Sequence, residues 1–270
     1  MKKALAVLLA FAVMMAAAAC GGSNSQTSSG AEKEEAAETA ETTASVEMNV
    51  PEEAISYEEY VAAEPESEVV ISGYIQGKTD LAGQDANTNT NLYLQDDSGG
   101  AYFVYELPCT PKQHELLEVG HKIKVKGFKA SYYGEIEVIE PTWQLEDGEF
   151  IAEPEDVTDL LGTDELIGRQ NKLVSFTGLT VTSAAKNDAG EDVAFLYNWD
   201  GSGKEGDDLY FNVSKDDRTY SFTVNAALCG PDTDVYKAVK ELKIGDTVDV
   251  TGFLYWYEDP NPHVTSLTIK

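Results

Sequence analysis

The strongest constraint in the sequence is an internal repeat, which fills most of the chain beyond residue 68. The first copy has its marks at 69–75, 92–105, Cys109, 119–128 and 135–139, and the second has the matching marks at 173–179, 209–224, Cys229, 244–253 and 264–269. Within these segments apolar and polar residues alternate or nearly so, and glycine, aspartate and serine mark the turns. Each copy is therefore expected to be a unit built mainly of β-strands.

A helical segment is expected between the third and fourth strands of each copy. In the first copy Thr110 can cap a helix that has Pro111 at its first position, and in the second copy Asp232 starts a run with helical spacing. A further short helix is expected just before the first copy, because Ser56 and Glu59 have the spacing of a capping box. The order in each copy is thus three strands, a helix and two strands.

This order resembles the OB-fold, in particular a small bacterial version that carries the motifs Leu-Tyr-Leu-Gln-Asp, at 92–96 here, and Val-Gly-His-Lys-Ile-Lys-Val-Lys-Gly, at 119–127. The resemblance covers about 69–140 and 172–270. It implies a mainly β protein with two consecutive OB-like five-stranded Greek-key barrels, each with a short helix between strands 3 and 4. The second copy departs from the pattern by about 27 extra residues, and an inserted strand is expected there near 193–199.

The N-terminus has the pattern of a targeting signal. Residues 1–3 are positively charged in sum, residues 4–15 form an apolar run too short to span a bilayer, and small residues then precede Cys20. This resembles a bacterial lipoprotein signal, with residues 1–19 as the signal peptide; the alternative is an ordinary signal peptide followed by a chance cysteine. The resemblance implies a diacylglyceryl group, with palmitate-type acyl chains, on Cys20. The partner would then be membrane lipid, and the location the extracytoplasmic face of the cell membrane.

The charge of the chain is strongly asymmetric, with 48 acidic against 19 basic side chains and a net charge of -29. Residues 20–55 are rich in Ser, Thr, Ala and Glu and are expected to be a disordered acidic tether, because they offer little apolar surface to bury. After it we expect a short helix and the first barrel at 56–147, a linker with short helical segments at 148–171, and the second barrel at 172–270. The whole plan resembles tandem OB-fold surface lipoproteins of anaerobic Gram-positive bacteria, a resemblance that implies no particular ligand.

Candidate binding residues come from the loops that join strands 4 and 5, because OB barrels present ligands to these loops, to the loops between strands 1 and 2, and to strands 2 and 3. The first barrel has Tyr132 and Tyr133 there, and the second has Tyr255, Trp256 and Tyr257. Exposed rings in such loops can stack on a ligand; the alternative is that the rings close the end of the barrel. Alternation sends Tyr255 and Tyr257 to one side and Trp256 to the other, and Trp256 is expected to be a stacking platform.

Nucleic acid is the less favoured ligand. Lys122, Lys124 and Lys126 fall on one face of the fourth strand, but the second copy has Thr247, Asp249 and Thr251 at the matching positions. Because affinity for polynucleotides comes largely from neutralised phosphates, an acidic chain favours a solvated lysine face over a phosphate ridge. The expected function is a noncatalytic binding or interaction module for a protein or an oligosaccharide. The alternative is extracellular nucleic-acid or oligosaccharide binding through the aromatic loops.

Catalysis, cofactors and metals have little support in the sequence. The three histidines are scattered, and neither His-x-x-x-His nor Gly-x-Ser-x-Gly occurs, so neither an enzyme nor a cofactor is expected. The acidic stretches at 187–192 and 200–208 are interpreted as turns, with a loose calcium site as the alternative. Cys109 and Cys229 occupy equivalent places and are interpreted as reduced core residues, although an extracytoplasmic location also permits a disulfide between them.

Overall fold

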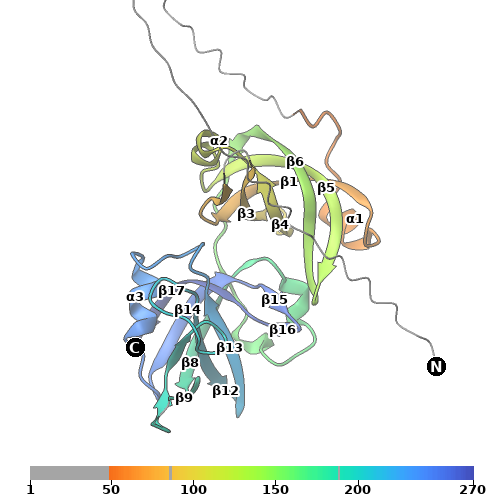
Figure 1. The fold of residues 1–270 in the computed structure, drawn as a ribbon. Coiled ribbons are helices and arrows are strands. Elements are labelled where there is room, and N and C mark those ends of the chain that lie inside the picture. The colour runs from red at the N-terminus through yellow and green to blue at the C-terminus, as the bar shows by residue number, and fades with distance from the viewer. Residues whose placement is uncertain (1–48, 85–86, 188) are drawn as a thin grey trace, which may run out of the picture. The chain divides into compact units, whose positions relative to one another are not determined.

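The computed structural model describes residues 49–84, 87–187 and 189–270 (Figure 1). The expected signal peptide, Cys20 and most of the expected tether therefore lie outside the described residues. Within the part of the chain that is described, no helix is both long enough and apolar enough to cross a membrane.

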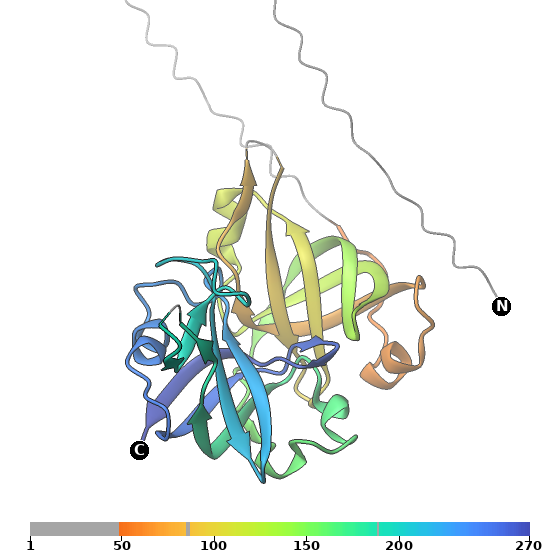
Figure 2. The ribbon, with the colours of Figure 1, turned by 60° about the horizontal axis from the view of Figure 1, so that its bottom comes forward.

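The first copy of the repeat folds into a closed barrel. Its elements are α1 (Tyr57–Ala62), β1 (Glu68–Lys78), β2 (Ala82–Gln84), β3 (Asn87–Gln95), β4 (Ala101–Pro108), α2 (Pro111–Leu116), β5 (His121–Tyr132) and β6 (Glu135–Glu149). The pairing runs β1–β3–β4–β6–β5 and returns from β5 to β1, with β4 and β6 parallel. This is the strand order of an OB barrel, and Figure 2 shows these strands curling around one another.

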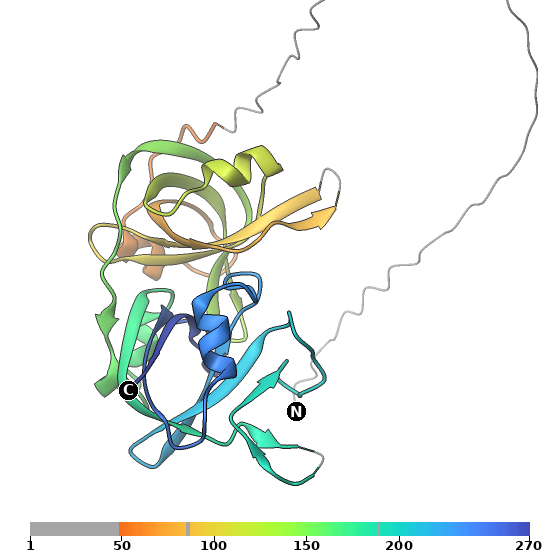
Figure 3. The same cartoon turned by 90° about the vertical axis from the view of Figure 1, so that its left-hand side faces the viewer.

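The second copy repeats this topology. Its barrel strands are β8 (Leu173–Thr182), β12 (Leu209–Lys215), β13 (Arg218–Val224), β14 (Thr247–Phe253) and β17 (His263–Ile269), with α3 (Asp234–Lys240) between β13 and β14. They close in the order β8–β12–β13–β17–β14, with β13 and β17 parallel, and α3 packs against β17 (Figure 3). The predicted fold, mainly β with two consecutive OB-like barrels, is confirmed.

The second barrel carries additions that the first lacks. They are β9 (Ala185–Lys186), β10 (Asp192–Val193) and β11 (Phe195–Tyr197) between the first two barrel strands, and β15 (Trp256–Tyr257) and β16 (Asp259–Pro260) between the last two. β11 pairs with β12 and so adds a strand at the predicted place. β15 and β16 pair with each other as a small hairpin.

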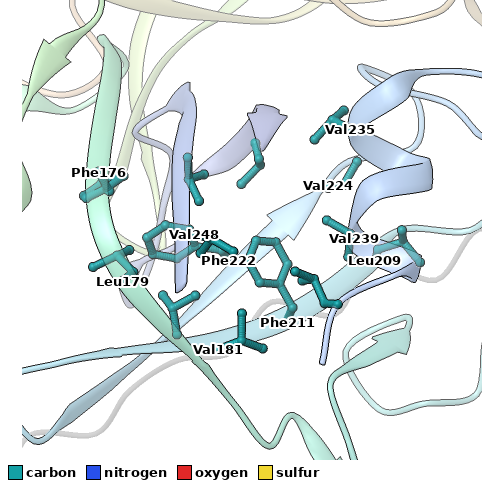
Figure 4. Close-up of a cluster of buried hydrophobic side chains, with 14 of the residues drawn as sticks. Phe176, Leu179, Val181, Leu209, Phe211, Phe222, Val224, Val235, Val239 and Val248 are labelled. Atoms are coloured by element: carbon teal, nitrogen blue, oxygen red, sulfur yellow. The ribbon is translucent and has the colours of Figure 1, made fainter. Parts of the chain in front are cut away.

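Alternation along the strands builds a separate core in each barrel. In the second barrel Phe176, Phe211 and Phe222 point inward and meet, with aliphatic side chains around them (Figure 4). In the first barrel Ile123 and Val125 are fully buried, so Lys122, Lys124 and Lys126, which alternate with them, face away from the core as predicted.

The helix caps follow the sequence signals closely. The Ser56–Glu59 and Thr110–Gln113 capping boxes both form, with Pro111 opening α2. The third helix begins one residue later than expected, because the side chain of Thr233 rather than that of Asp232 accepts the capping hydrogen bond. Cys109 and Cys229 are free and buried, and burial raises the pKa of each thiol to about 11.

The segment before α1 is attached to the first barrel. The tether is expected to end at residue 55, yet Val50 is 1% exposed and its N–H donates to Gln144 Oε1 at 2.8 Å. Ile55 N–H donates to Val70 O at 2.8 Å, and Lys126 pairs with Glu52 at 2.6 Å. An aliphatic side chain and backbone hydrogen bonds thus hold the last residues of the expected tether on the barrel.

The expected linker contributes structure of its own. β6 continues to Glu149, two residues past the expected end of the first barrel. β7 (Glu155–Asp156) then pairs in parallel with β8, and two short 3₁₀ helices follow, at Thr158–Leu160 and Leu166–Arg169. Leu161 and Leu166 belong to the core of the second barrel, so this segment is part of that barrel's packing.

Candidate functional site

Part of the outer face of β3 and β4 in the first barrel, at Tyr93 and Phe103, is covered by the second barrel. Tyr93 and Phe103 form a buried cluster with Phe253, which ends β14. The rings of Tyr93 and Phe253 are stacked, with centroids 4.2 Å apart and planes 3° apart. Gly77 permits this approach, since a Cβ there would lie 2.6 Å from the Phe253 ring. The first barrel therefore uses its OB ligand face for contact within the chain.

A neutral histidine links the two barrels beside this cluster. His263 begins β17, and its Nδ1 lies 2.7 Å from the hydroxyl of Tyr93. Tyr255 stacks on the imidazole with centroids 4.3 Å apart. Burial lowers the pKa of His263 to about 3, so the ring is uncharged at neutral pH.

A buried carboxyl group lies at the same interface. Glu135 begins β6, is 0% exposed, and accepts hydrogen bonds from Trp256 N–H at 2.8 Å and Gln170 Nε2 at 3.2 Å. Burial raises its pKa to about 8. Within the described residues its Oε1 and Asn171 Oδ1 have no hydrogen-bond partner, and Asn171 is one of the groups that act on this carboxyl. Trp256, Asn171 and Gln170 act to lower this pKa, and the burial of the carboxyl group outweighs them.

The matching face of the second barrel is open. Leu209, Phe211 and Val213 point into the core, so Tyr210 and Asn212 on β12 point outward, and Asn212 lies opposite Ser221 on β13. These three outward side chains form the floor of a cleft of about 730 Å³, a size typical of ligand sites. This is the surface of an OB barrel that ordinarily receives ligand.

Both barrels and the insertion form the walls of this cleft. Asn91, Phe103, Tyr105 and Tyr132 come from the first barrel, and Tyr255, Tyr257, Asn261 and His263 come from the second. Ala184, Leu196 and Trp199 come from the insertion, and Asp208 and Asn225 flank the ends of β12 and β13. The cleft is therefore rich in aromatic and amide side chains.

The two aromatic loops proposed separately from the sequence meet in space. Tyr133 stacks on Tyr257 with centroids 4.8 Å apart, and Tyr132 packs edge-on against Tyr133 at the same separation. Glu258 N–H also donates to Tyr133 O at 2.7 Å. Of the five predicted ring residues, Tyr132, Tyr255 and Tyr257 line the cleft, and Tyr133 supports Tyr257 from behind.

Trp256 lies elsewhere, as the alternation predicted. It is half-buried, packs against the core of the second barrel, and its ring lies against Gly134, where a Cβ would be 2.8 Å from Cδ1. Trp256 lines a second cleft of about 750 Å³, which shares Ser221, Tyr257 and Asn261 with the first. Trp256, the expected stacking platform, thus lies outside the first cleft. Part of its ring packs between the barrels.

Trp199 is the most exposed aromatic side chain of the first cleft and was missed as a site residue. Its exposed fraction is 76%, and it follows β11 in the insertion. The sequence signal was available, because this insertion occupies the loop between strands 1 and 2, which is one of the two OB ligand loops. Tyr105 and the cleft asparagines were missed because no local pattern separates them from ordinary strand residues.

The first cleft is poor in charge. Among the described residues that line it, none is lysine or arginine, and Asp208 is the single acidic side chain. Asp208 accepts a hydrogen bond from Ala226 N–H at 2.7 Å, and burial raises its pKa. The lysine face lies on β5 instead, where Lys124 and Lys126 pair with Glu146 and Glu52.

No metal cluster forms in the described part of the chain, since no group of three His, Cys, Asp or Glu side chains there has metal-binding geometry. In the first acidic stretch Asn187 Oδ1 accepts from the N–H groups of Ala189 and Glu191, and in the second Asp200 Oδ1 accepts from Ser202 N–H. These oxygens close turns, as the favoured interpretation predicted.

Comparisons with known proteins found solved structures of low sequence identity. No family model and no curated protein matches the chain. Among solved structures, the p204 HINb domain is 10% identical with a TM-score of 0.35, covering 77% of this chain and all of that one. The Ifi202 HINa domain in complex with 20bp dsDNA is 11% identical with a TM-score of 0.33, covering 76% and 98% of the two chains. The wild-type single-stranded DNA binding protein from Thermus aquaticus is 16% identical with a TM-score of 0.24, covering 77% and 94%. The tandem OB fold of this chain rests on its own strand pairing.

Proposed function

We propose that the chain is a noncatalytic binding module, held at the extracytoplasmic face of the cell membrane by diacylglyceryl-Cys20, with its ligand site in the cleft on the second barrel. One observation carries this proposal: the β12–β13 face is open and walled by aromatic side chains from both barrels, whereas Tyr93 and Phe103 on the matching face of the first barrel are buried. Binding in such a cleft needs shape and stacking surfaces rather than a reactive group.

The titratable groups near the cleft support a binding role rather than a catalytic one. His263 is held between Tyr93 and Tyr255, and Glu135 accepts hydrogen bonds from Trp256 and Gln170. Both groups are engaged in joining the barrels. A general acid or base must instead reach the proton that it transfers on a bound substrate.

The lipid anchor is supported by the signal-like pattern at 1–19 and by Cys20, and it is tested by Cys20→Ser. That variant is expected to lose metabolic labelling with palmitate and to appear in the medium or as an uncleaved precursor, because the thioether has no other attachment atom. Replacing Cys229, which is buried in the second barrel, by Ser is the matched control for loss of a thiol. Continued palmitate labelling of the Cys20→Ser chain contradicts the anchor.

The cleft is tested by a mixed array of glycans and oligonucleotides probed with the full chain in nonionic detergent. Trp199→Ala is expected to weaken any signal about five-fold or more, since loss of one stacking platform costs about 1–3 kcal/mol. Phe128→Ala is the control, because Phe128 is exposed on β5 and does not line the cleft. Equal signals from the two variants place the binding surface outside the cleft and overturn the proposal.

A further inference from the structure

We propose that the ligand of this cleft is a neutral oligosaccharide that runs from the first cleft into the second. This inference rests on the proposed function and adds the chemical class of the ligand. Four observations support it: the charge of the cleft, its exposed rings, its fixed amide groups and the continuity of the two clefts.

The charge of the first cleft disfavours a polyanion. Polynucleotides and acidic glycans are bound through lysine and arginine, and among the described residues that line this cleft there are none. The carboxyl group of Asp208 lies at its edge, and the imidazole of His263 is neutral. The chain as a whole has a net charge of -29, which repels a polyanion at long range as well.

Exposed rings offer flat apolar surfaces to the ligand. Trp199 is 76% exposed, Tyr132 51%, Tyr257 45% and Tyr105 40%. Tyr257 is stacked on Tyr133, so little side-chain entropy is lost when a ligand covers it. Sugar rings present C–H faces that pack on such surfaces, while their hydroxyl groups project from the edge of the ring.

The asparagines of the cleft supply partners for those hydroxyl groups. Oδ1 of Asn91 accepts from Glu106 N–H, Oδ1 of Asn225 from Leu228 N–H, and Oδ1 of Asn261 from Thr223 Oγ1. Each bond fixes the amide plane and leaves its NH₂ group without a protein acceptor among the described residues. Asn212 is fixed through its other end, since its Nδ2 donates to Ser183 O. Its side-chain carbonyl oxygen is therefore the end that can accept from a ligand. Hydroxyl groups both donate and accept, so they can satisfy both kinds of amide end.

The two clefts adjoin. Ser221, Tyr257 and Asn261 line both of them, so a ligand that leaves the floor of the first cleft past Tyr257 enters the second, which Trp256 and Arg218 also line. The volumes of about 730 and 750 Å³ make each cleft large enough for a drug-sized ligand. An extended chain of several sugar units fits this arrangement better than one compact molecule.

The test is calorimetric titration of the full chain in nonionic detergent with a fixed panel of probes. The neutral probes are the hexasaccharides of maltose, cellulose, xylan, mannan and chitin type, each with its trisaccharide. The other probes are hexagalacturonate, the oligonucleotide dT12 and decaproline. At least one neutral hexasaccharide is expected to bind with an affinity that changes less than two-fold between 20 and 300 mM NaCl, and at least ten-fold more tightly than its trisaccharide.

The variants tie that binding to the cleft. Asn212→Ala is expected to weaken the hexasaccharide about ten-fold or more, whereas Ser214→Ala, two residues along the same face of β12, changes it less than two-fold. Unchanged circular dichroism and urea midpoints show that both variants are folded.

The outcomes separate the ligand class from the cleft. Absence of binding by every neutral hexasaccharide, or tighter binding of a charged probe or of decaproline, overturns the oligosaccharide proposal. If such a probe loses affinity in Asn212→Ala, the cleft remains the site and only the ligand class is wrong. A neutral hexasaccharide that binds Asn212→Ala and Trp199→Ala as well as the parent chain overturns the proposed function of the cleft.

Discussion

The two barrels share one topology but put the same surface to opposite uses. On the first barrel, Tyr93 and Phe103 of the β3–β4 face are buried against Phe253. On the second, Tyr210 and Asn212 of the β12–β13 face form the floor of an open cleft. A duplicated fold therefore does not imply duplicated sites, because one copy can use its ligand face to fix the position of the other.

Equivalent residues of the repeat show how this asymmetry is built. The fourth strand of each barrel carries a Gly-Phe pair, yet Phe128 is 37% exposed and Phe253 is 2% exposed. The fifth strand begins with Glu135 in one barrel and His263 in the other, and both of these side chains lie between the barrels. The interface thus draws on the start of the fifth strand in both copies, although the registers differ: Phe253 pairs with His263, whereas Phe128 pairs with Ile139.

The largest expected effect comes from removing the ring that joins the barrels. Phe253→Ala is expected to lower the free energy of unfolding by about 3–5 kcal/mol, because it leaves a cavity against Tyr93 and Phe103. Phe128→Ala, the repeat-equivalent control, is expected to lower it by less than about 1 kcal/mol, since that ring is partly in water. Urea unfolding of the full chain measures both. Equal losses in the two variants contradict the asymmetry of the barrels.

That pair of phenylalanines also shows how far the sequence could predict the structure. The strands, the capping boxes at Ser56 and Thr110, and the OB order follow from local periodicity and short-range hydrogen bonds, which each segment carries within itself. Burial of Phe253 rather than Phe128 depends on how the two barrels meet. Both residues follow a glycine on the fourth strand of their barrel, so no local pattern distinguishes them.

The candidate site was predictable only in part for the same reason. The rings of Tyr132 and Tyr257 were identified because an OB barrel presents its strand 4–5 loops, but their meeting in one cluster depends on the interface between the barrels. Trp199 lies in an insertion that the first copy lacks, so the repeat offered no comparison for it. Trp256 looked like its neighbours in sequence, and its packing against Gly134 is a contact between distant segments.

A second prediction concerns the two titratable groups of the interface. Glu135 has an ordinary pKa of 4.5 and a folded pKa of about 8, so between these values the folded state holds a proton that the unfolded chain has released. Stability from this group therefore falls as the pH rises through that window, by at most about 1.4 kcal/mol per pH unit. His263 acts in the opposite direction, because its pKa drops from 6.5 to about 3 and its contribution is lost as the pH falls through that range.

The two contributions oppose each other between pH 4.5 and 6.5, and above 6.5 that of Glu135 acts alone. Glu135→Gln is expected to remove about 2 kcal/mol of the stability loss between pH 6.5 and 8, because the amide remains neutral and can still accept from Trp256 N–H. Urea midpoints at half-unit steps of pH measure this. Glu149→Gln, at the exposed end of the same strand, is the control. An unchanged slope above pH 6.5 in Glu135→Gln shows that the buried carboxyl is not the group that titrates.

The smallest expected effect on stability comes from the residue that follows each Gly-Phe pair. The second barrel has Leu254 there, fully buried in its core, whereas the first has Lys129, which is 7% exposed and donates from Nζ to the carbonyl oxygens of Tyr60, Val61 and Ala63. These carbonyls end α1, so one lysine fastens that helix to β5 through the positive charge that a helix C-terminus favours. Lys129→Met keeps the length of the side chain and removes the donors. We expect it to cost about 1–2 kcal/mol, since the carbonyls at this helix end can turn partly to water.

The readout for Lys129→Met is local as well as global. Loss of the three hydrogen bonds frees α1 before the barrel unfolds, so limited proteolysis is expected to cut near Tyr57–Ala62 sooner than in the parent chain. Lys126→Met is the matched control, because Lys126 lies on the same strand but pairs with Glu52 and Glu68 at the surface. Equal cleavage rates in the two lysine variants show that α1 is held by Tyr60 and its aromatic neighbours alone. Faster cleavage confined to Lys129→Met shows that the first barrel uses this position to fix its N-terminal helix, where the second uses it to fill its core.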